Sequence, residues 1–284
     1  MDKLSENLEQ INNENSCFMI LNEEQHKLLK EKLKYILNYI HNICTQNNIK
    51  YYAVGGTLLG AVRHKGMIPW DDDADIAMYK DDFKKFKKAL KKDSNKEFFL
   101  QTLYTDKYYC QIMPKLRLNN TIIENLGEEN CKMNKGIFVD IFMLDCSNHI
   151  NKKKNEKKSL FHKKIMRIIG IKRLKKINEV NYSLLKRILI KIIPIWFLLL
   201  IDKIYLHAKN NGKYTMNFTS IYRIDKQTFP SNYYGEPKKL EFDGQLIYVP
   251  SEYIKILESI YGDYMQLPPI EKRGLHHKLT KFKV

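Results

Sequence analysis

The feature that most constrains the fold is an apolar run at residues 136–145 that carries Asp140 in its middle. A run of this length and composition predicts a strand buried inside a sheet. Alternation along that strand places Asp140 on the face opposite Val139 and Ile141. Because a lone buried carboxylate is costly, we expect Asp140 to be paired with a cation or bound to a metal.

A glycine pair followed by an acidic cluster lies upstream of this run. Residues 49–54 predict a short strand ending on Gly55 and Gly56, residues 57–64 a helix, and Asp73 and Asp75 sit on a strand that continues to residue 79. A glycine pair between strand and helix lets the backbone approach a phosphate closely. Two Asp at alternate positions of a strand point to the same side, where they can hold one or two Mg²⁺ ions, or Mn²⁺.

Asp73, Asp75 and Asp140 are therefore the predicted catalytic and metal-binding residues. Clustered carboxylates repel one another unless a cation neutralises them, which favours a metal site. Asp73 and Asp75 can hold metal that bridges phosphate oxygens, and Asp140 on a neighbouring strand can hold a second ion and orient an acceptor hydroxyl. The alternative is a solvated acidic loop and a strand-end Asp without chemistry.

The remaining pattern predicts an α/β (α+β) fold with a mixed sheet flanked by helices. A helix begins after Asn22, which with Gln25 forms a capping box, and a surface helix covers residues 80–92. We expect four segments: a flexible leader at 1–21, a catalytic core at 22–150, a basic helical segment at 151–211, and a part at 212–284 that completes the catalytic domain.

The basic segment ends in an apolar run at residues 192–201, which Pro194 interrupts. Its ten residues are about half of what a membrane-spanning helix needs. Two interpretations remain, a buried helix and a helix lying on a membrane surface.

Composition permits several anionic partners. The formal net charge is +17, which suits nucleic acid, an acidic membrane surface or phosphorylated small molecules. Five scattered cysteines without metal-like spacing indicate free thiols in a reducing compartment. The polar start predicts no signal peptide, so we expect a cytoplasmic protein, or one peripheral at the inner face of the cell membrane.

A long stretch of the chain closely resembles the signature of the LicD family, which holds bacterial phosphorylcholine transferases and relatives of the fukutin type. Residues 48–76 read NIKYYAVGGTLLGAVRHKGMIPWDDDADI, and residues 136–142 read GIFVDIF. The likeness continues at Lys115-Leu116-Arg117 and at residues 261–269, and it spans about residues 22–280.

This resemblance implies a nucleotidyltransferase-like fold and a phosphotransferase activity. The enzyme would move a phosphorylated alcohol such as phosphocholine from a CDP-linked donor to a sugar hydroxyl of a cell-surface glycan or glycolipid, as in lipopolysaccharide, teichoic acid or capsule precursors. Besides the three carboxylates, the predicted substrate-binding residues are Gly55, Gly56, Thr57, Arg63, Lys65, Lys115, Arg117 and His276.

Two other functions compete with this one. A nucleotidyltransferase acting on RNA or a small molecule would use the same carboxylates, but we see no RNA-binding module and expect no nucleic-acid partner. A catalytically silent scaffold on an anionic membrane would rest on the run at 192–201, and it would leave the three carboxylates without purpose.

Overall fold

The computed structural model describes residues 18–174, 182–205, 209–217, 219–220, 224–274 and 277–284. Most of the predicted leader at 1–21 therefore lies outside the described residues, as does His276. The four described cysteines, Cys44, Cys110, Cys131 and Cys146, are free thiols.

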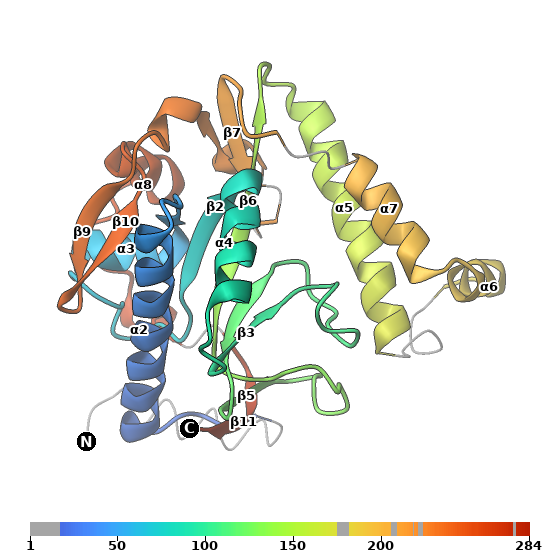
Figure 1. Cartoon of the computed structure of the whole chain (residues 1–284), viewed down its shortest axis with the longest axis horizontal. Coiled ribbons are helices and arrows are strands. Elements are labelled where there is room, and N and C mark those ends of the chain that lie inside the picture. Colours follow the sequence, from blue (N-terminus) through green and yellow to red (C-terminus); the bar gives the residue numbers. More distant parts are fainter. Residues whose placement is uncertain (1–17, 175–181, 206–208, 218, 221–223, 275–276) are drawn as a thin grey trace.

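A mixed sheet of seven strands forms the centre of the molecule (Figure 1). Its strands are β1 (Tyr52–Ala53), β2 (Asp75–Tyr79), β3 (Phe98–Gln101), β4 (Lys115–Leu118), β6 (Phe138–Ser147), β7 (Tyr214–Asn217) and β8 (Thr228–Pro230). The order is β1-β2-β6-β4-β3, and β7 joins β6 to β8. Strands β2 and β6 run parallel, whereas their other neighbours are antiparallel.

Strand β6 is the longest strand and pairs with three others. Its first residues pair with β4, its middle with β2, and its last residues with β7. Val139, Ile141 and Leu144 are fully buried, as expected for a strand covered on both faces. The predicted central strand with Asp140 inside it is thus confirmed.

Helices cover the sheet and extend beyond it. They are α2 (Glu23–Gln46), α3 (Gly55–Arg63), α4 (Lys80–Lys92), α5 (Lys152–Arg173), α6 (Leu184–Ile192), α7 (Ile195–Tyr205) and α8 (Tyr253–Tyr261). The capping box of Asn22 and Gln25 opens α2 as predicted. Because α2 and α4 contact each other as well as β6, they cover one face of the sheet together (Figure 1).

Two small sheets lie beside the main one. Strand β5 (Ile122–Asn125) pairs with β11 (Leu279–Lys283), and β9 (Lys238–Phe242) pairs with β10 (Gln245–Val249). The short 3₁₀ helices are η1 (Ile224–Gln227), η2 (Ser231–Tyr233) and η3 (Ile270–Lys272). The predicted α/β class, with a mixed sheet flanked by helices, is confirmed, while the four-segment division of the chain stays a prediction.

Helices α5, α6 and α7 form a separate layer at one flank of the molecule (Figure 1). Leu198 of α7 packs with Ile165, Met166 and Ile169 of α5 in a small core of its own. The predicted apolar run at 192–201 is not one helix, because α6 ends at Ile192 and α7 begins after Pro194. In the part of the chain that the structure describes, no helix is long and apolar enough to cross a membrane.

The structure corrects three local details of the sequence analysis. The predicted strand at 49–54 is reduced to β1, and the following helix starts at Gly55 rather than at residue 57. Asp73 lies in the loop before β2, so it does not share a strand face with Asp75. The glycine pair is therefore the first turn of α3 rather than a free loop.

Candidate active site

Two of the predicted carboxylates lie side by side in the central sheet. Asp75 at the start of β2 is the register partner of Asp140 on β6, and Asp140 is also the register partner of Lys115 on β4. The backbone N–H of Asp140 donates to the carbonyl of Ala74 at 2.9 Å. Parallel pairing of β2 and β6 thus brings together residues that are far apart in the sequence.

The glycine pair packs directly against this acidic group. A Cβ on Gly55, whose φ is +57°, would lie 2.8 Å from Oδ2 of Asp75, and a Cβ on Gly56 would lie 2.5 Å from Oδ2 of Asp71. Only glycine leaves room for both carboxylates at this place. Since this is the positive end of α3, the helix also favours negative charge there.

Thr57 holds Asp75 in place. Its hydroxyl oxygen accepts a hydrogen bond of 2.7 Å from the backbone N–H of Asp75, and its side chain is buried. Thr57 was predicted to bind substrate, but in the structure it contacts the backbone of the acidic loop. Its position suits the support of a carboxylate rather than contact with a ligand.

A buried ion pair joins Asp140 to the next strand. Nζ of Lys115 donates to Oδ1 of Asp140 at 2.5 Å, and their side chains are 3% and 8% exposed. The ammonium group also lies 3.5 Å from the ring centroid of Phe138. Of the two fates expected for Asp140, pairing with a cation is therefore present in the structure, and Lys115 engages only one carboxylate oxygen.

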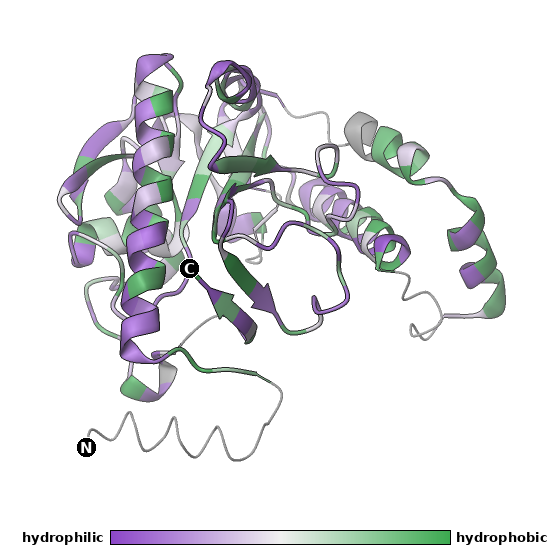
Figure 2. Cartoon of the chain, turned by 60° about the horizontal axis from the view of Figure 1, so that its bottom comes forward, coloured by the Kyte–Doolittle hydropathy of each residue, from purple (hydrophilic) through white to green (hydrophobic). Residues whose placement is uncertain are grey.

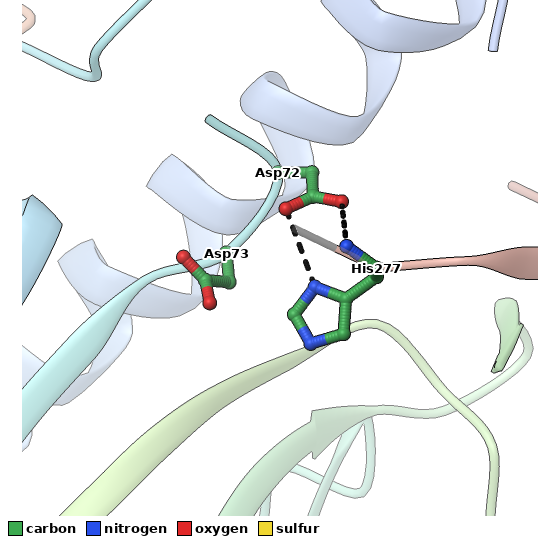
Figure 3. A group of neighbouring side chains, drawn as sticks. All are labelled: Asp72, Asp73 and His277. Atoms are coloured by element: carbon green, nitrogen blue, oxygen red, sulfur yellow. Dashed lines mark hydrogen bonds and ion pairs between the residues drawn. The ribbon is translucent and has the colours of Figure 1, made fainter. Parts of the chain in front are cut away.

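The C-terminal segment contacts the acidic loop through His277. The backbone N–H of His277 donates to Oδ2 of Asp72 at 3.0 Å, and its Nδ1 lies 3.2 Å from Oδ1 (Figure 3). The carboxylate of Asp73 lies beside the same imidazole ring (Figure 3). Among the described residues, Asp72, Asp73 and His277 form a group whose ligand atoms all lie within 4.8 Å of one another, a spacing that suits a metal ion.

Burial and mutual repulsion shift the titration of these groups. Burial, followed by the charges of Asp73 and Asp72, raises the pKa of Asp71 to about 8. Burial and the charges of Asp73 and Asp140 raise the pKa of Asp75 well above 3.8. Burial by itself would lower the pKa of His277, but the hydrogen bond to Asp72 and the charges of Asp72 and Asp73 together raise it. A positive ion would relieve this concentration of negative charge.

The carboxylates open into a cavity of about 1160 Å³. Asp73, Asp75 and Asp140 all line it, together with Gly55 and Gly56. Residues from the C-terminal part of the chain also line it, among them Tyr264, Arg273 and His277. The donors on the sheet side are hard carboxylate oxygens, which fit Mg²⁺ better than a softer metal.

The predicted cationic residues occupy different places. Arg63 lines the cavity, and its Nη1 donates to the carbonyl of Tyr264 at 3.0 Å. Lys65 is exposed and is not among the residues that line the cavity. Arg117 is 1% exposed and donates to Gln101 and to the carbonyl of Gly136, so its charge is held inside the protein.

Sequence reasoning missed the supports that come from distant segments. His26 of α2 lies 3.1 Å from the carbonyl of Asp71, and Arg273 stacks 4.9 Å from the ring centroid of Trp70. No local pattern in the sequence links His277 to Asp72. The acidic run itself was the signal that a partner of this kind must exist.

With this geometry in view, the comparisons with known proteins identify the kind of domain. Residues 48–167 match the family model described as LicD/FKTN/FKRP, nucleotidyltransferase domain. This stretch includes the glycine pair, the acidic loop, β4 and β6. Residues 48–167 therefore resemble the nucleotidyltransferase domain of the LicD family, and the resemblance inferred from the sequence is confirmed.

Individual relatives extend the comparison. The chain is 27% identical over 257 residues to the lipopolysaccharide cholinephosphotransferase LicD of Haemophilus influenzae, a match that covers 85% of this chain and 92% of that protein. It is 38% identical over 50 residues to the human ribitol 5-phosphate transferase FKRP, which is 18% of this chain and 10% of that protein. The expectation of a LicD-like phosphotransferase is confirmed at this level of class.

Proposed function

We propose that the protein is a magnesium-dependent phosphotransferase that moves a phosphorylated alcohol of the phosphocholine kind from a CDP-linked donor to a sugar hydroxyl of a cell-surface glycan or glycolipid. The observation that carries the proposal is the register pairing of Asp75 with Asp140 at the floor of the cavity, next to Gly55. The relatives named above, a cholinephosphotransferase and a ribitol 5-phosphate transferase, support transfer of an alcohol phosphate.

Asp73, Asp75 and the second oxygen of Asp140 are the groups proposed to hold the metal. Bound there, Mg²⁺ would supply positive charge for the diphosphate of the donor. Asp72 is already engaged by His277, so it serves better to fix the loop than to bind the ion directly. Gly55 and Gly56 leave the N-terminus of α3 open to the phosphates.

In the proposed reaction, the acceptor hydroxyl attacks the phosphorus that carries the alcohol. A new phosphorus–oxygen bond forms to the sugar, the bond to CMP breaks, and the hydroxyl proton passes to Asp140. Lys115 forms a buried ion pair with Asp140 and fixes the position of its carboxylate. Arg63 lines the same cavity and can face the negative charge of the nucleotide.

The test is a product analysis with purified protein and Mg²⁺. CDP-choline, CDP-ribitol and CDP-glycerol would each be supplied with a glycolipid extract, and products would be identified by mass spectrometry. We expect CMP release and an acceptor that gains an alcohol phosphate, both absent in Asp75→Asn. An acceptor that gains a nucleotide instead would establish the competing nucleotidyltransferase function, and no product from any donor would refute the proposal.

For the location in the cell, we propose what the sequence predicts. A cytoplasmic protein placed peripherally at the inner face of an anionic membrane would suit a glycolipid acceptor. Cell fractionation with a tagged full-length chain would test it.

A further inference from the structure

Helix α6 turns its apolar side outward. Helical spacing places five large apolar side chains on one side of it. They are Leu184 (76% exposed), Leu185 (69%), Ile188 (44%), Leu189 (50%) and Ile192 (72%). On the opposite side, Ile190 is buried at 4% exposure. A surface helix normally points its apolar side to the core. The outward apolar side of α6 therefore indicates that another apolar surface covers it.

Helix α7 continues the same arrangement after Pro194. Its inner side is fixed to α5 by Leu198, whereas Trp196, Phe197 and Leu200 are 66%, 41% and 45% exposed. The apolar run at 192–201 is therefore partly core and partly surface. We call the outward side chains of Leu184, Leu185, Ile188, Leu189, Ile192, Trp196, Phe197 and Leu200 the α6–α7 apolar surface.

The charged residues of α6 are all basic. Lys186, Arg187 and Lys191 flank the apolar side of α6, and no Asp or Glu occurs from residue 183 to residue 201. On helix α5, Nζ of Lys172 donates to the carbonyl of Lys191 at 3.0 Å and ties α6 to the rest of the layer. In Figure 2 this flank carries long hydrophobic stretches with hydrophilic bands between them.

We infer that the α6–α7 apolar surface docks on an anionic lipid bilayer. Apolar side chains enter the boundary between headgroups and acyl chains, and each Lys or Arg beside them adds about 1 kcal/mol of attraction to acidic headgroups. Trp196 is a residue type that favours this boundary. Charge complementarity selects the bilayer over a second copy of the chain, because two such surfaces would bring like charges together.

The layer is connected to the active-site cavity through α5. Nζ of Lys163 donates to the carbonyl of Ser220 at 3.0 Å, and Ser220 lines the cavity. Docking would therefore hold the cavity near the membrane that carries a glycolipid acceptor. Only this last step rests on the proposed function, because the surface itself is defined without reference to the carboxylates.

Co-sedimentation of the full-length chain with vesicles tests the inference without donor or acceptor, so its outcome is independent of catalysis. We expect binding to phosphatidylcholine vesicles that contain phosphatidylglycerol, weaker binding as salt rises, and little binding to phosphatidylcholine alone. Leu185→Asn with Ile192→Asn should weaken binding by about tenfold or more, because both side chains are exposed and enter the lipid.

Two controls make the experiment decisive. Leu246→Asn changes a 48% exposed side chain on β10, outside this surface, and should leave binding unchanged. Arg187→Glu with Lys191→Glu should abolish the preference for acidic lipid. The inference would be overturned if the protein did not sediment with the vesicles that contain phosphatidylglycerol. Equal and salt-insensitive binding to both kinds of vesicle would also overturn it. So would self-association in sedimentation velocity that Leu185→Asn with Ile192→Asn abolishes, since the surface would then bind a second copy.

Discussion

At the scale of single residues, the site concentrates negative charge, and the burial and mutual repulsion of its carboxylates lower the stability of the folded protein. Burial and repulsion raise the pKa of both Asp71 and Asp75. The fold holds these carboxylates in place with glycine at positions 55 and 56, the hydroxyl of Thr57 and the imidazole of His277. Such an arrangement is typical of a functional site, where stability is sacrificed for chemistry.

We predict that Asp73→Asn and Asp75→Asn each abolish turnover and leave the fold intact. A neutral amide is a poorer Mg²⁺ ligand than a carboxylate, and each change removes one negative charge from a group of carboxylates that repel one another. Product formation from a CDP-alcohol and thermal melting would be measured on the same samples. Asp81→Asn, at an exposed position of α4, is the matched control and should keep full turnover. Near-normal turnover in either site variant would remove that residue from the site.

Asp140 is predicted to have two separable roles. Asp140→Ala should lower turnover by about a hundredfold or more. It should also cost about 3–5 kcal/mol of stability, because Lys115 would be left buried without its partner. Adding Lys115→Met should restore most of the stability but none of the turnover.

Chemical denaturation and product analysis of the single and double variants would check this prediction. A double variant with near-normal turnover would mean that Asp140 is only a structural partner of Lys115. Unchanged stability in the single variant would show that the ion pair contributes little.

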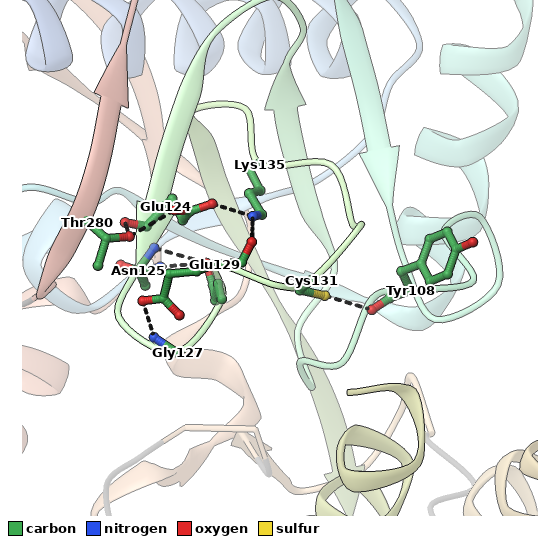
Figure 4. A network of polar contacts seen from close by, with 9 residues as sticks. Tyr108, Glu124, Asn125, Gly127, Glu129, Cys131, Lys135 and Thr280 are labelled. Atoms are coloured by element: carbon green, nitrogen blue, oxygen red, sulfur yellow. Dashed lines mark hydrogen bonds and ion pairs between the residues drawn. The ribbon is translucent and has the colours of Figure 1, made fainter. Parts of the chain in front are cut away.

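At the scale of elements, the C-terminal strand is what brings His277 to the acidic loop. Strand β11 follows His277 and pairs with β5, and Glu124 of β5 accepts hydrogen bonds from Lys135 and from the hydroxyl of Thr280 at 3.0 Å (Figure 4). The small β5–β11 sheet therefore anchors one wall of the cavity. Loss of its contacts should affect stability in a pH-dependent way.

The hydrogen bond from Lys135, with that from Thr280, holds the pKa of Glu124 below its ordinary value of 4.5. Its stabilising effect is thus fully present above pH 4.5 and is lost as pH falls through the lower, folded-state pKa. We predict that Glu124→Gln lowers the free energy of unfolding by about 1 kcal/mol at pH 7, and that the difference narrows below pH 4.5. Urea denaturation across this range would measure it, with Glu31→Gln on the exposed side of α2 as control. A difference that is constant with pH would contradict the assignment.

Local patterns in the sequence predicted most of the elements. Apolar periodicity located α2, α4 and β6, and the capping box located the start of α2. The end of the strand before Gly55 and the start of α3 were misplaced by a few residues, because the glycine pair is compatible with both a loop and a first helical turn.

Contacts between distant segments could not be predicted in the same way. Asp140 was expected to find a cation or a metal, but only the register of β4 against β6 identifies Lys115 as its partner. Asp72 and His277 are 205 positions apart, and no local pattern joins them. The exposure of the apolar side of α6 could not be predicted either, because the sequence pattern of an apolar helix is the same whether it faces a core or a membrane.

At the scale of the whole molecule, a chain with a formal net charge of +17 contains a cavity lined by Asp73, Asp75 and Asp140. A net positive charge of this size should attract anionic ligands toward the protein. The carboxylates of the cavity are a local region of negative charge, where a divalent cation can bind although the protein as a whole is basic. This contrast suggests that metal binding and global stability are coupled.

We predict that Mg²⁺ raises the melting temperature and that the increase grows from pH 5 to pH 8. The pKa of Asp71 is raised to about 8 and that of Asp75 well above 3.8, so the folded protein binds more protons than the unfolded chain between the ordinary and the raised values. Stability without metal is therefore lost as pH rises through this window, while the carboxylates become free of protons and able to bind metal. At a hundred times its dissociation constant, Mg²⁺ would add about 2.7 kcal/mol, a shift of about 5 °C or more for a chain of this size.

Differential scanning fluorimetry with and without EDTA would measure the effect, with potassium chloride at equal ionic strength as the salt control. Asp75→Asn should melt higher than the unchanged protein when metal is absent, because it lacks one buried charge, and should lose most of the response to Mg²⁺. Asp81→Asn should retain that response, since its exposed carboxylate lies on α4. A response to Mg²⁺ that is the same at pH 5 and pH 8, or that survives in Asp75→Asn, would place the ion elsewhere on the protein. In that event the repulsion among Asp71, Asp73 and Asp75 would have to be relieved by protons or by the substrate itself.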